Sequence, residues 1–295
     1  MNNKVAAIVV TYNRKKLLKK NIRALLAQTY KNFLDILVID NASTDFTKEA
    51  IQQYINNKDI IYINTGKNLG GAGGFNFGMR KAAELNYKFM WIMDDDTIPT
   101  PTALEELIKE DKKLNGNYGF LSSKVLWKDN SVCKMNIQKR TKWRRIHNFE
   151  TTQNIQYASF VSFFIPTKVV KKMGLPYKEF FIWSDDWEYS RRISKKYTCR
   201  YVPDSIVKHW CNSNVGADIV DAPANRINRF SYLFRNDVVL YRLDGLEGSF
   251  YLNLRTIKYI IKILLKGNNK KQKLHIMFSA LKKGKNFYPV IEYIN

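Results

Sequence analysis

The chain has 295 residues, of which 45% are hydrophobic and 14% aromatic, so it can bury a full core and is too apolar for a disordered protein. Lys and Arg number 49 against 26 Asp and Glu, and the formal charge of +23 predicts an anionic partner: nucleic acid, an acidic membrane surface or a phosphorylated substrate. Cys133, Cys199 and Cys211 lack C-x-x-C spacing, which disfavours a disulfide framework or a zinc ribbon and fits a reducing cytosol.

The first third of the chain alternates between strand and helix patterns. Short apolar runs at residues 5–10, 36–39, 60–63 and 89–93 read as buried strands, and helical patterns separate them. This alternation predicts an α/β fold with a doubly wound, mostly parallel sheet. The N-terminus lacks the apolar core of a signal peptide, and no run of about 18 apolar residues predicts a membrane span.

Polar residues follow the first two predicted strands. Thr11, Tyr12 and Arg14 come after the first strand, where backbone can line a pocket, an aromatic ring can stack on a base and a guanidinium can reach phosphate. Asp40 ends the second strand. Its carboxylate can accept from a nucleobase N–H or a ribose hydroxyl, or it can cap the following helix.

A glycine-rich segment follows the third strand. Six of the 14 glycines fall between residues 66 and 78, which we interpret as a loop preceding a helix that contains Phe75 and Met79. Its N–H groups can face a diphosphate or a sugar at a helix N-terminus. No Gly-Lys-Ser/Thr follows, so it is not a P-loop. The candidate contacts are Asn68, Gly70, Gly71 and Gly73.

Three consecutive carboxylates, Asp94, Asp95 and Asp96, follow the apolar run at 89–93. Adjacent like charges repel unless a cation or strong donors offset them, and hard oxygen ligands suit Mg²⁺ or Mn²⁺. Ligands bind at the carboxyl ends of strands in open α/β sheets, which favours a site here. A helix cap or a solvated turn is the alternative.

The second half is less regular. Residues 119–127 and 156–165 are predicted strands, with a basic stretch at 134–147 between them. His209 follows a strand-like segment, and hard-metal sites can add one imidazole to a carboxylate pair. His147 and His275 lie in basic segments and receive no role.

Asp185 and Asp186 lie at the predicted start of a helix, where the helix dipole stabilises negative charge. Trp183 and Trp187 flank them, and sugar rings stack well on tryptophan. One carboxylate can therefore serve as general base for an attacking hydroxyl. A capped helix with exposed acids explains the pattern equally well.

Residues from 225 onward have a helical pattern. Within 254–266, apolar residues recur at i, i+3, i+4, i+7 and i+8 while lysines occupy another face. Residues 251–295 carry ten Lys or Arg and one Glu, a net +9. Such a helix can lie on an anionic bilayer, or it can pack on the rest of the protein with a solvated lysine face.

Together these pieces resemble the inverting, metal-dependent glycosyltransferases of the GT-A fold, family 2. The similar segments occur in family order across roughly residues 4–212. They are Ala7-Ile8-Val9-Val10-Thr11-Tyr12-Asn13-Arg14, Asp40-Asn41-Ala42-Ser43-Thr44-Asp45, Asn68-Leu69-Gly70-Gly71-Ala72-Gly73-Gly74-Phe75, Asp94-Asp95-Asp96, Asp185-Asp186-x-Glu188 and His209. The glycine segment and the Trp-x-Asp-Asp-x-Glu-Tyr cluster are most similar to bacterial galactofuranosyltransferases, and related rhamnosyltransferases share much of the pattern.

The resemblance implies roles for individual residues. Asp94, Asp96 and His209 would bind Mn²⁺ or Mg²⁺, and the metal would hold the nucleotide diphosphate of the donor. Asp186 would be the catalytic base; Ser184, which departs from the family pattern, leaves Asp185 as an alternative base. The implied donor contacts are Thr11, Tyr12, Arg14, Asp40, Asn68, Gly70, Gly71, Gly73, Asp94 and Asp95, and the implied acceptor contacts are Trp183, Trp187 and Glu188.

The predicted enzyme transfers galactofuranose from UDP-galactofuranose, with inversion, to a hydroxyl of a lipid-linked precursor of a cell-surface polysaccharide. dTDP-rhamnose is the alternative donor. We expect a GT-A domain at 1–224 and a basic helical extension at 225–295, peripheral to the cytoplasmic face of the plasma membrane and compatible with a homo-oligomer. A nucleic-acid-binding protein would leave the acidic and glycine motifs unexplained, and a nucleotidyltransferase would release pyrophosphate.

Overall fold

The computed structural model describes residues 2–216 and 218–294, and nine strands in these residues form one sheet. The strands are β1 (Asn2–Thr11), β2 (Leu34–Asp40), β3 (Ile61–Asn64), β4 (Tyr87–Asp94), β5 (Thr97–Pro99), β6 (Leu121–Leu126), β7 (Gln153–Asn154), β8 (Phe163–Pro166) and β9 (Arg200–His209). Their order across the sheet is β3-β2-β1-β4-β8-β6-β9-β5, and β7 also pairs with β9.

The sheet has a parallel half and a mixed half. β1 pairs in parallel with β2 and β4, and β2 with β3, as the alternating pattern predicted. β8 runs antiparallel to β4 and β6, so the whole sheet is mixed rather than mostly parallel. A parallel neighbour needs a long crossover connection, usually a helix. The segment between β6 and β8 contains a 3-10 turn, η2 (Lys134–Asn136), and the short strand β7, but no α-helix. Of the predicted strand at 156–165, only the part in β8 is a strand.

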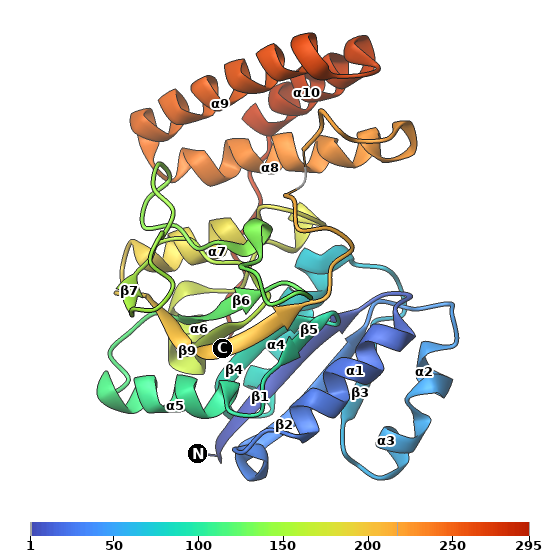
Figure 1. Cartoon of the computed structure of the whole chain (residues 1–295), viewed down its shortest axis with the longest axis vertical. Coiled ribbons are helices and arrows are strands. Elements are labelled where there is room, and N and C mark those ends of the chain that lie inside the picture. The colour runs from blue at the N-terminus through green and yellow to red at the C-terminus, as the bar shows by residue number, and fades with distance from the viewer. Residues whose placement is uncertain (1, 217, 295) are drawn as a thin grey trace.

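Helices cover both faces of the sheet (Figure 1). The side chains of β1 alternate, so that Ala7 and Val9 face one core with α1 and α5 while Ala6 and Ile8 face the other with α4, α6 and α7. The helices are α1 (Lys15–Leu26), α2 (Thr47–Ala50), α3 (Gln52–Asn56), α4 (Gly70–Glu84), α5 (Ala103–Lys113), α6 (Thr167–Met173), α7 (Asp185–Ser194), α8 (Phe230–Arg242), α9 (Gly245–Lys266) and α10 (Lys270–Lys285). The further 3-10 turns are η1 (Lys31–Phe33), η3 (Lys178–Phe180) and η4 (Ala224–Arg229).

The predicted loop at 66–78 is wrong from residue 70 onward, where α4 begins. The glycines serve close packing within this helix. A Cβ added at Gly74 would lie 2.6 Å from Val10 Cγ1, and one added at Gly78 would lie 2.5 Å from Ile8 Cγ2. Glycine is unfavourable inside a helix, but here it lets α4 lie directly on β1.

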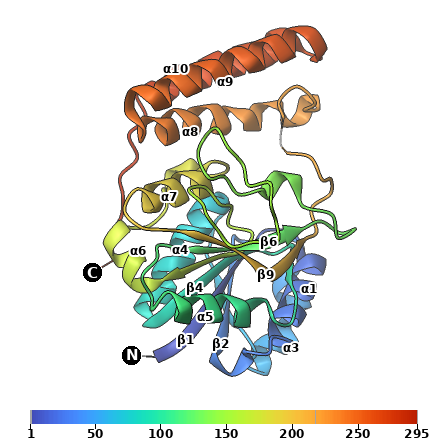
Figure 2. The same cartoon turned by 60° about the vertical axis from the view of Figure 1, so that its left-hand side comes forward.

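The last three helices form a separate layer at one end of the molecule (Figures 1 and 2). α8 lies against the rest of the protein, where Val239 packs with Tyr177 and Phe180. The buried Asn236 amide donates to the carbonyls of Phe180, Ile182 and Trp183 at 3.0, 3.1 and 2.9 Å. α8 therefore holds the segment that leads into α7.

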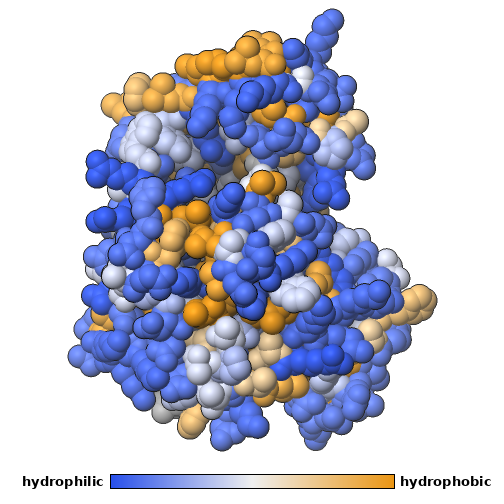
Figure 3. Space-filling view, viewed as in Figure 1, coloured by the Kyte–Doolittle hydropathy of each residue, from blue (hydrophilic) through white to orange (hydrophobic). Residues whose placement is uncertain are grey.

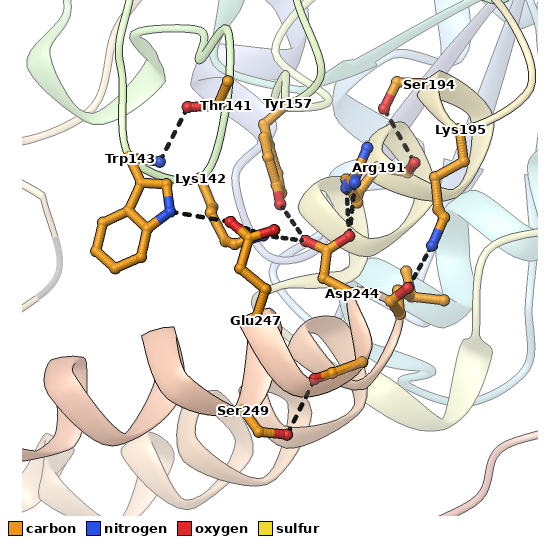
Figure 4. A network of polar contacts seen from close by, with 12 residues as sticks. Thr141, Lys142, Trp143, Tyr157, Arg191, Ser194, Lys195, Asp244, Glu247 and Ser249 are labelled. Carbon is orange, nitrogen blue, oxygen red and sulfur yellow. Dashed lines mark hydrogen bonds and ion pairs between the residues drawn. The ribbon is translucent and has the colours of Figure 1, made fainter.

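A network of ion pairs and hydrogen bonds fixes the turn between α8 and α9 (Figure 4). Asp244 accepts from Arg191 Nε at 2.9 Å and from Lys142 Nζ at 3.0 Å. Trp143 Nε1 donates to Glu247 at 3.2 Å and its ring packs edge-on against Tyr251. Part of the basic stretch at 134–147 is thus used in contacts within the protein.

α9 has an exposed apolar face. Leu246 is 91% exposed and Leu265 75%, and the orange residues along the upper edge of Figure 3 lie where Figure 1 draws α9 and α10. The exposed apolar residues of this helix are Leu246, Phe250, Leu254, Ile257, Ile261, Leu264 and Leu265. Within residues 2–216 and 218–294, no helix combines the length and the hydropathy needed to cross a bilayer.

Candidate active site

The carboxyl ends of β1, β2 and β4 meet at one edge of the sheet. In the β1–β2 register Thr11 lies opposite Asp40, and in the β1–β4 register Val10 lies opposite Asp94. The polar residues that follow these strands are therefore close together, as predicted for ligand binding at this edge.

The three aspartates have different surroundings. Asp95 is 2% exposed and accepts from Thr11 Oγ1 at 2.7 Å and from Arg14 Nη1 at 3.3 Å. Burial raises the pKa of Asp95 to about 7, although the Arg14 charge opposes this rise. Arg14 also donates to Asp96 Oδ2 at 2.7 Å. Asp95 is thus held by the chain itself and orients Arg14 beside the cavity.

Asp94, Asp96 and His209 form a cluster whose ligand atoms all lie within 4.8 Å of one another. Pairing of β5 with β9 sets Thr97 opposite His209, which brings the imidazole to the triplet. Burial and the neighbouring Asp96 charge raise the pKa of Asp94 to about 6. Burial also opposes ionisation of Asp96, but contacts with His209 and Arg14 outweigh it and lower its pKa.

These residues fit a hard divalent cation. Asp96 Oδ1 is buried and accepts no hydrogen bond from the described residues, although His209 Nε2 is 3.2 Å away. A buried carboxylate oxygen without a donor is costly, and a cation would satisfy it. Two carboxylates and an imidazole are suitable donors for Mn²⁺ or Mg²⁺.

Asp185 and Asp186 form a second acidic pair at the first turn of α7. Burial raises the pKa of Asp185 to about 7, with Asp94 among the charges that add to the rise. Burial and the Asp185 charge raise the pKa of Asp186 well above its ordinary value. Since Asp94 perturbs both groups, the two acidic clusters are neighbours. A carboxylate with a raised pKa is a stronger base once ionised.

The backbone before α7 is strained. Phe181, Trp183 and Ser184 have φ values of +64°, +67° and +63°, which lie in the left-handed region that side chains disfavour. Ser184 Oγ donates to Asp237 of α8 at 2.8 Å. This hydrogen bond to the C-terminal helical layer stabilises the strained conformation. The acidic pair is therefore positioned by contacts with α8 as well as by its own helix.

A cavity of about 1210 Å³ joins the two acidic clusters. Most of the predicted site residues line it: Thr11, Tyr12, Arg14, Asn68, Gly70, Gly71, Asp94, Asp95, Asp96, Trp183, Asp185, Asp186, Trp187 and His209. The indole of Trp183 packs on Phe230 at 4.9 Å between ring centroids, and Lys139 Nζ lies 3.9 Å from the ring centroid of Trp187.

Three predicted contacts lie outside this cavity. Asp40 is buried and accepts from Tyr62 Oη at 2.7 Å and from the Ser43 N–H at 2.8 Å. Gly73 lines a separate hollow on the other side of α4. Glu188 is fully buried in a two-bond ion pair with Arg192, at 2.9 and 3.0 Å, so its geometry is at odds with the predicted acceptor contact.

The sequence did not predict two features of the site: the basic side chains on one wall of the cavity, and the thiols of Cys133 and Cys211 next to His209. The C-terminal helical layer contributes basic side chains to the cavity, and Cys211 lines it beside His209. Helix periodicity placed lysines on one face of the segment at 254–266, but it did not show which element that face meets. The basic residues of the cavity other than Arg14 are Lys134, Arg145, Arg229, Arg255, Lys258 and Lys262.

Two solved structures show the same fold at low sequence identity. S. aureus TarS superposes with a TM-score of 0.59 and 15% identity over 96% of this chain and 44% of that chain. The structure of GalNAc-T7 with UDP, GalNAc and Mn²⁺ superposes with a TM-score of 0.59 and 15% identity over 78% of this chain and 48% of that chain. The likeness supports the predicted GT-A fold with C-terminal helices.

The sequence is similar to known glycosyltransferases and matches one family model. The uncharacterized glycosyltransferase MJ1057 of Methanocaldococcus jannaschii is 28% identical over 210 residues, 70% of each chain. The galactofuranosyltransferase GlfT1 of Mycolicibacterium smegmatis is 35% identical over 101 residues, 34% of this chain and 32% of that protein. A GalNAc(5)-diNAcBac-PP-undecaprenol beta-1,3-glucosyltransferase of Campylobacter jejuni is 32% identical over 125 residues, 42% of this chain and 38% of that protein. Residues 6–174, more than half of the chain, match the glycosyl transferase family 2 model, so the protein belongs to that family and is a glycosyltransferase.

Proposed function

We propose that the chain is a metal-dependent, inverting transferase that moves galactofuranose from UDP-galactofuranose to a hydroxyl of a lipid-linked glycan precursor. The observation that carries this proposal is the pair of acidic clusters in one cavity. Asp94, Asp96 and His209 are suited to a cation, and Asp185 and Asp186 have raised pKa values suited to proton transfer.

In this proposal Asp94, Asp96 and His209 hold Mn²⁺ or Mg²⁺. The bound cation would offset negative charge on the departing nucleoside diphosphate. Arg14 supplies a fixed positive charge beside it, because Asp95 and Asp96 orient the guanidinium toward the cavity. Thr11, Tyr12 and the backbone at Gly70 and Gly71 form the surrounding wall for the nucleotide.

Asp186 is the proposed base. It is partly exposed to the cavity, whereas Asp185 is 7% exposed. The acceptor hydroxyl gives its proton to Asp186 as its oxygen bonds to C1 of the sugar, and the bond from C1 to the diphosphate oxygen breaks on the opposite face. A single displacement inverts C1. An NMR assignment of the product anomer tests this, and a retained configuration would contradict it.

The donor is proposed from the partial similarity to GlfT1 and from the motif resemblance. The direct test is release of nucleoside diphosphate from UDP-galactofuranose, UDP-galactopyranose, UDP-glucose and dTDP-rhamnose in the presence of Mn²⁺. Fastest release from UDP-galactofuranose supports the proposal. Fastest release from dTDP-rhamnose assigns the alternative rhamnosyltransferase, and release of pyrophosphate would instead indicate a nucleotidyltransferase.

The lipid-linked acceptor is supported by the helical layer, which we propose as a membrane-facing extension of the catalytic domain. Arg255 and Lys258 of α9 line the cavity, while its apolar residues face outward. Lys266, which is exposed and lies outside the cavity lining, ends this helix, and a lysine near an anionic membrane surface contributes about 1 kcal/mol. The name of the Campylobacter relative includes a PP-undecaprenol glycan. α9 would thus lie on the cytoplasmic leaflet and present the acceptor to the cavity.

A nucleic-acid-binding role has less support. Lys139 and Lys142 of the basic stretch are buried, and Lys142 pairs with Asp244. Nucleic acid is bound through exposed basic groups whose counterions are released, so these two lysines are unavailable, although Lys134, Arg140, Arg144 and Arg145 are exposed. Salt-dependent retention of RNA without any binding of UDP would favour that function.

A further inference from the structure

Two cysteines lie beside the proposed hard-cation cluster. Cys133 Sγ is 3.8 Å from His209 Nδ1, and the ligand atoms of Cys133, His209 and Cys211 all lie within 4.8 Å of one another. Cys133 is fully buried, whereas Cys211 is partly exposed and lines the cavity with His209. All three cysteines of the chain are free thiols in the structure.

The fold holds these groups together from distant segments. The Cys133 N–H donates to the Val125 carbonyl at 2.9 Å, which fixes Cys133 beyond the end of β6. β6 and β9 run in parallel, so the end of β9 carries His209 and then Cys211 to the same place. Trp127 Nε1 donates to the Cys211 carbonyl at 3.1 Å and anchors that residue. The cluster is therefore anchored to the neighbouring ends of β6 and β9.

Neither thiol suits the cation proposed for transfer. Mn²⁺ and Mg²⁺ prefer oxygen, whereas thiolates with an imidazole select zinc and similar soft or borderline cations. Two sulfurs and one nitrogen, with a fourth position open to water, form a known type of tetrahedral zinc site. The open position here would face the cavity, which also provides the route of entry.

We propose that Cys133, Cys211 and His209 Nδ1 form a second cation site, for Zn²⁺ or a cation of similar thiol affinity, and that its occupancy inhibits the enzyme. A neutral imidazole has one lone pair for a metal, and its other nitrogen carries hydrogen. In the structure Nδ1 lies 2.8 Å from Asn136 Oδ1, and the Cys133 thiol donates to the same oxygen at 3.0 Å, so zinc must displace both contacts. With Nδ1 on zinc, Nε2 carries the hydrogen and donates to Asp96, which is 3.2 Å away. His209 then cannot serve as a ligand of the hard cation. This inhibitory consequence rests on the proposed function, whereas zinc binding does not.

Cobalt(II) tests the site directly in the full-length chain under reducing conditions. Co²⁺ bound by thiolate produces a sulfur-to-cobalt charge-transfer band in the near ultraviolet, and Zn²⁺ should displace it. We expect the band in the parent protein, in Asp94→Asn and in the matched control Cys199→Ser, whose cysteine is outside the cluster. Cys211→Ser should lose it. Cys133→Ser is a second variant, and circular dichroism checks that each variant is folded.

Zn²⁺ affinity should fall by at least roughly 10- to 100-fold in Cys211→Ser, the loss that even outer-shell changes cause. Absence of the band from the folded parent, or an unchanged band in both cysteine variants, would overturn the proposal. So would a Cys133–Cys211 disulfide that persists in reducing buffer.

A competition assay then tests inhibition. Micromolar Zn²⁺ should reduce Mn²⁺-dependent release of nucleoside diphosphate by the parent and by Cys199→Ser, and should reduce that of Cys211→Ser much less. Equal inhibition of all three would overturn the shared-histidine model. If no donor is turned over at all, the proposed function fails while the cobalt result still decides the thiol site.

Discussion

The two walls of the cavity are built differently. The wall at β1, β2 and β4 consists of short motifs at strand ends, and its polar groups hold one another, as Asp95 does with Thr11 and Arg14. The wall at α7 to α9 is built from packed helices, and its backbone is strained before Asp185. In the proposed function, the first wall would be preformed for the nucleotide, whereas the second would differ with the acceptor.

The first wall should be the more sensitive to loss of one residue. Asp96→Ala removes the carboxylate that contacts both Arg14 and His209, so metal-dependent binding of UDP should be lost. Turnover should fall by about 10³-fold or more, because a cation supplies several kcal/mol of charge stabilisation. Calorimetric titration of UDP with and without Mn²⁺ measures the change. Asp129→Ala, at an exposed turn, is the control, and retained Mn²⁺-dependent binding in Asp96→Ala would contradict the cation site.

The second wall should separate binding from chemistry. Asp186→Asn preserves the shape of the side chain but removes the proposed base, so UDP affinity should stay near that of the parent while transfer falls roughly 10²- to 10⁴-fold. Donor binding and acceptor-dependent turnover are measured on the same preparation. Near-normal turnover in Asp186→Asn together with a large loss in Asp185→Asn would assign the base to Asp185.

The outward face of the helical layer should affect only lipid-bound acceptors. The double substitution Ile257→Ser and Ile261→Ser removes two apolar side chains that are 52% and 51% exposed. Because both are largely in solvent, their loss should not alter folding. Binding to phosphatidylglycerol–phosphatidylcholine vesicles in flotation should weaken at least about tenfold, because tenfold is about 1.4 kcal/mol and each side chain contributes up to about 1.5–3 kcal/mol when fully buried. Asn253→Ser on the same helix is the control. Equal flotation of the double variant and the control would contradict membrane binding through this face of α9.

A smaller effect should appear in stability against pH. Burial raises the pKa of Asp185 from 3.8 to about 7, so its contribution to folding is fully present below about pH 4 and is lost as the pH rises to about 7. At pH 8 the buried charge opposes folding. Asp185→Asn should therefore raise the free energy of unfolding at pH 8 by about 1–3 kcal/mol and leave it unchanged near pH 3. Urea unfolding in EDTA at both pH values measures this, and equal stabilisation at both would exclude the ionisation as its cause.

Local patterns predicted the first wall well. The apolar runs and the aspartate triplet depend on neighbouring residues, and the structure has both at one sheet edge. The glycine segment was misread because glycine disfavours helices, and only contact with Val10 and Ile8 shows why α4 contains so many. Cys133 and His209 are 76 positions apart, so no spacing rule could have paired them. Glu188 follows the acidic pair in sequence, but the helical turn directs it to Arg192 instead.

The glycine-rich start of α4 limits how the donor side can evolve. Main chain, rather than side chain, bounds the cavity at Gly70, where an added Cβ would lie 2.1 Å from the Phe181 carbonyl. Substitution there would displace the helix from its neighbours instead of reshaping the cavity. Gly71 differs, because an added Cβ would meet no atom within 4 Å. Gly71 is therefore the position in this stretch where a new side chain could alter sugar preference without a clash. Among enzymes with the same packing, sequences should differ most at this position and on the opposite wall of the cavity.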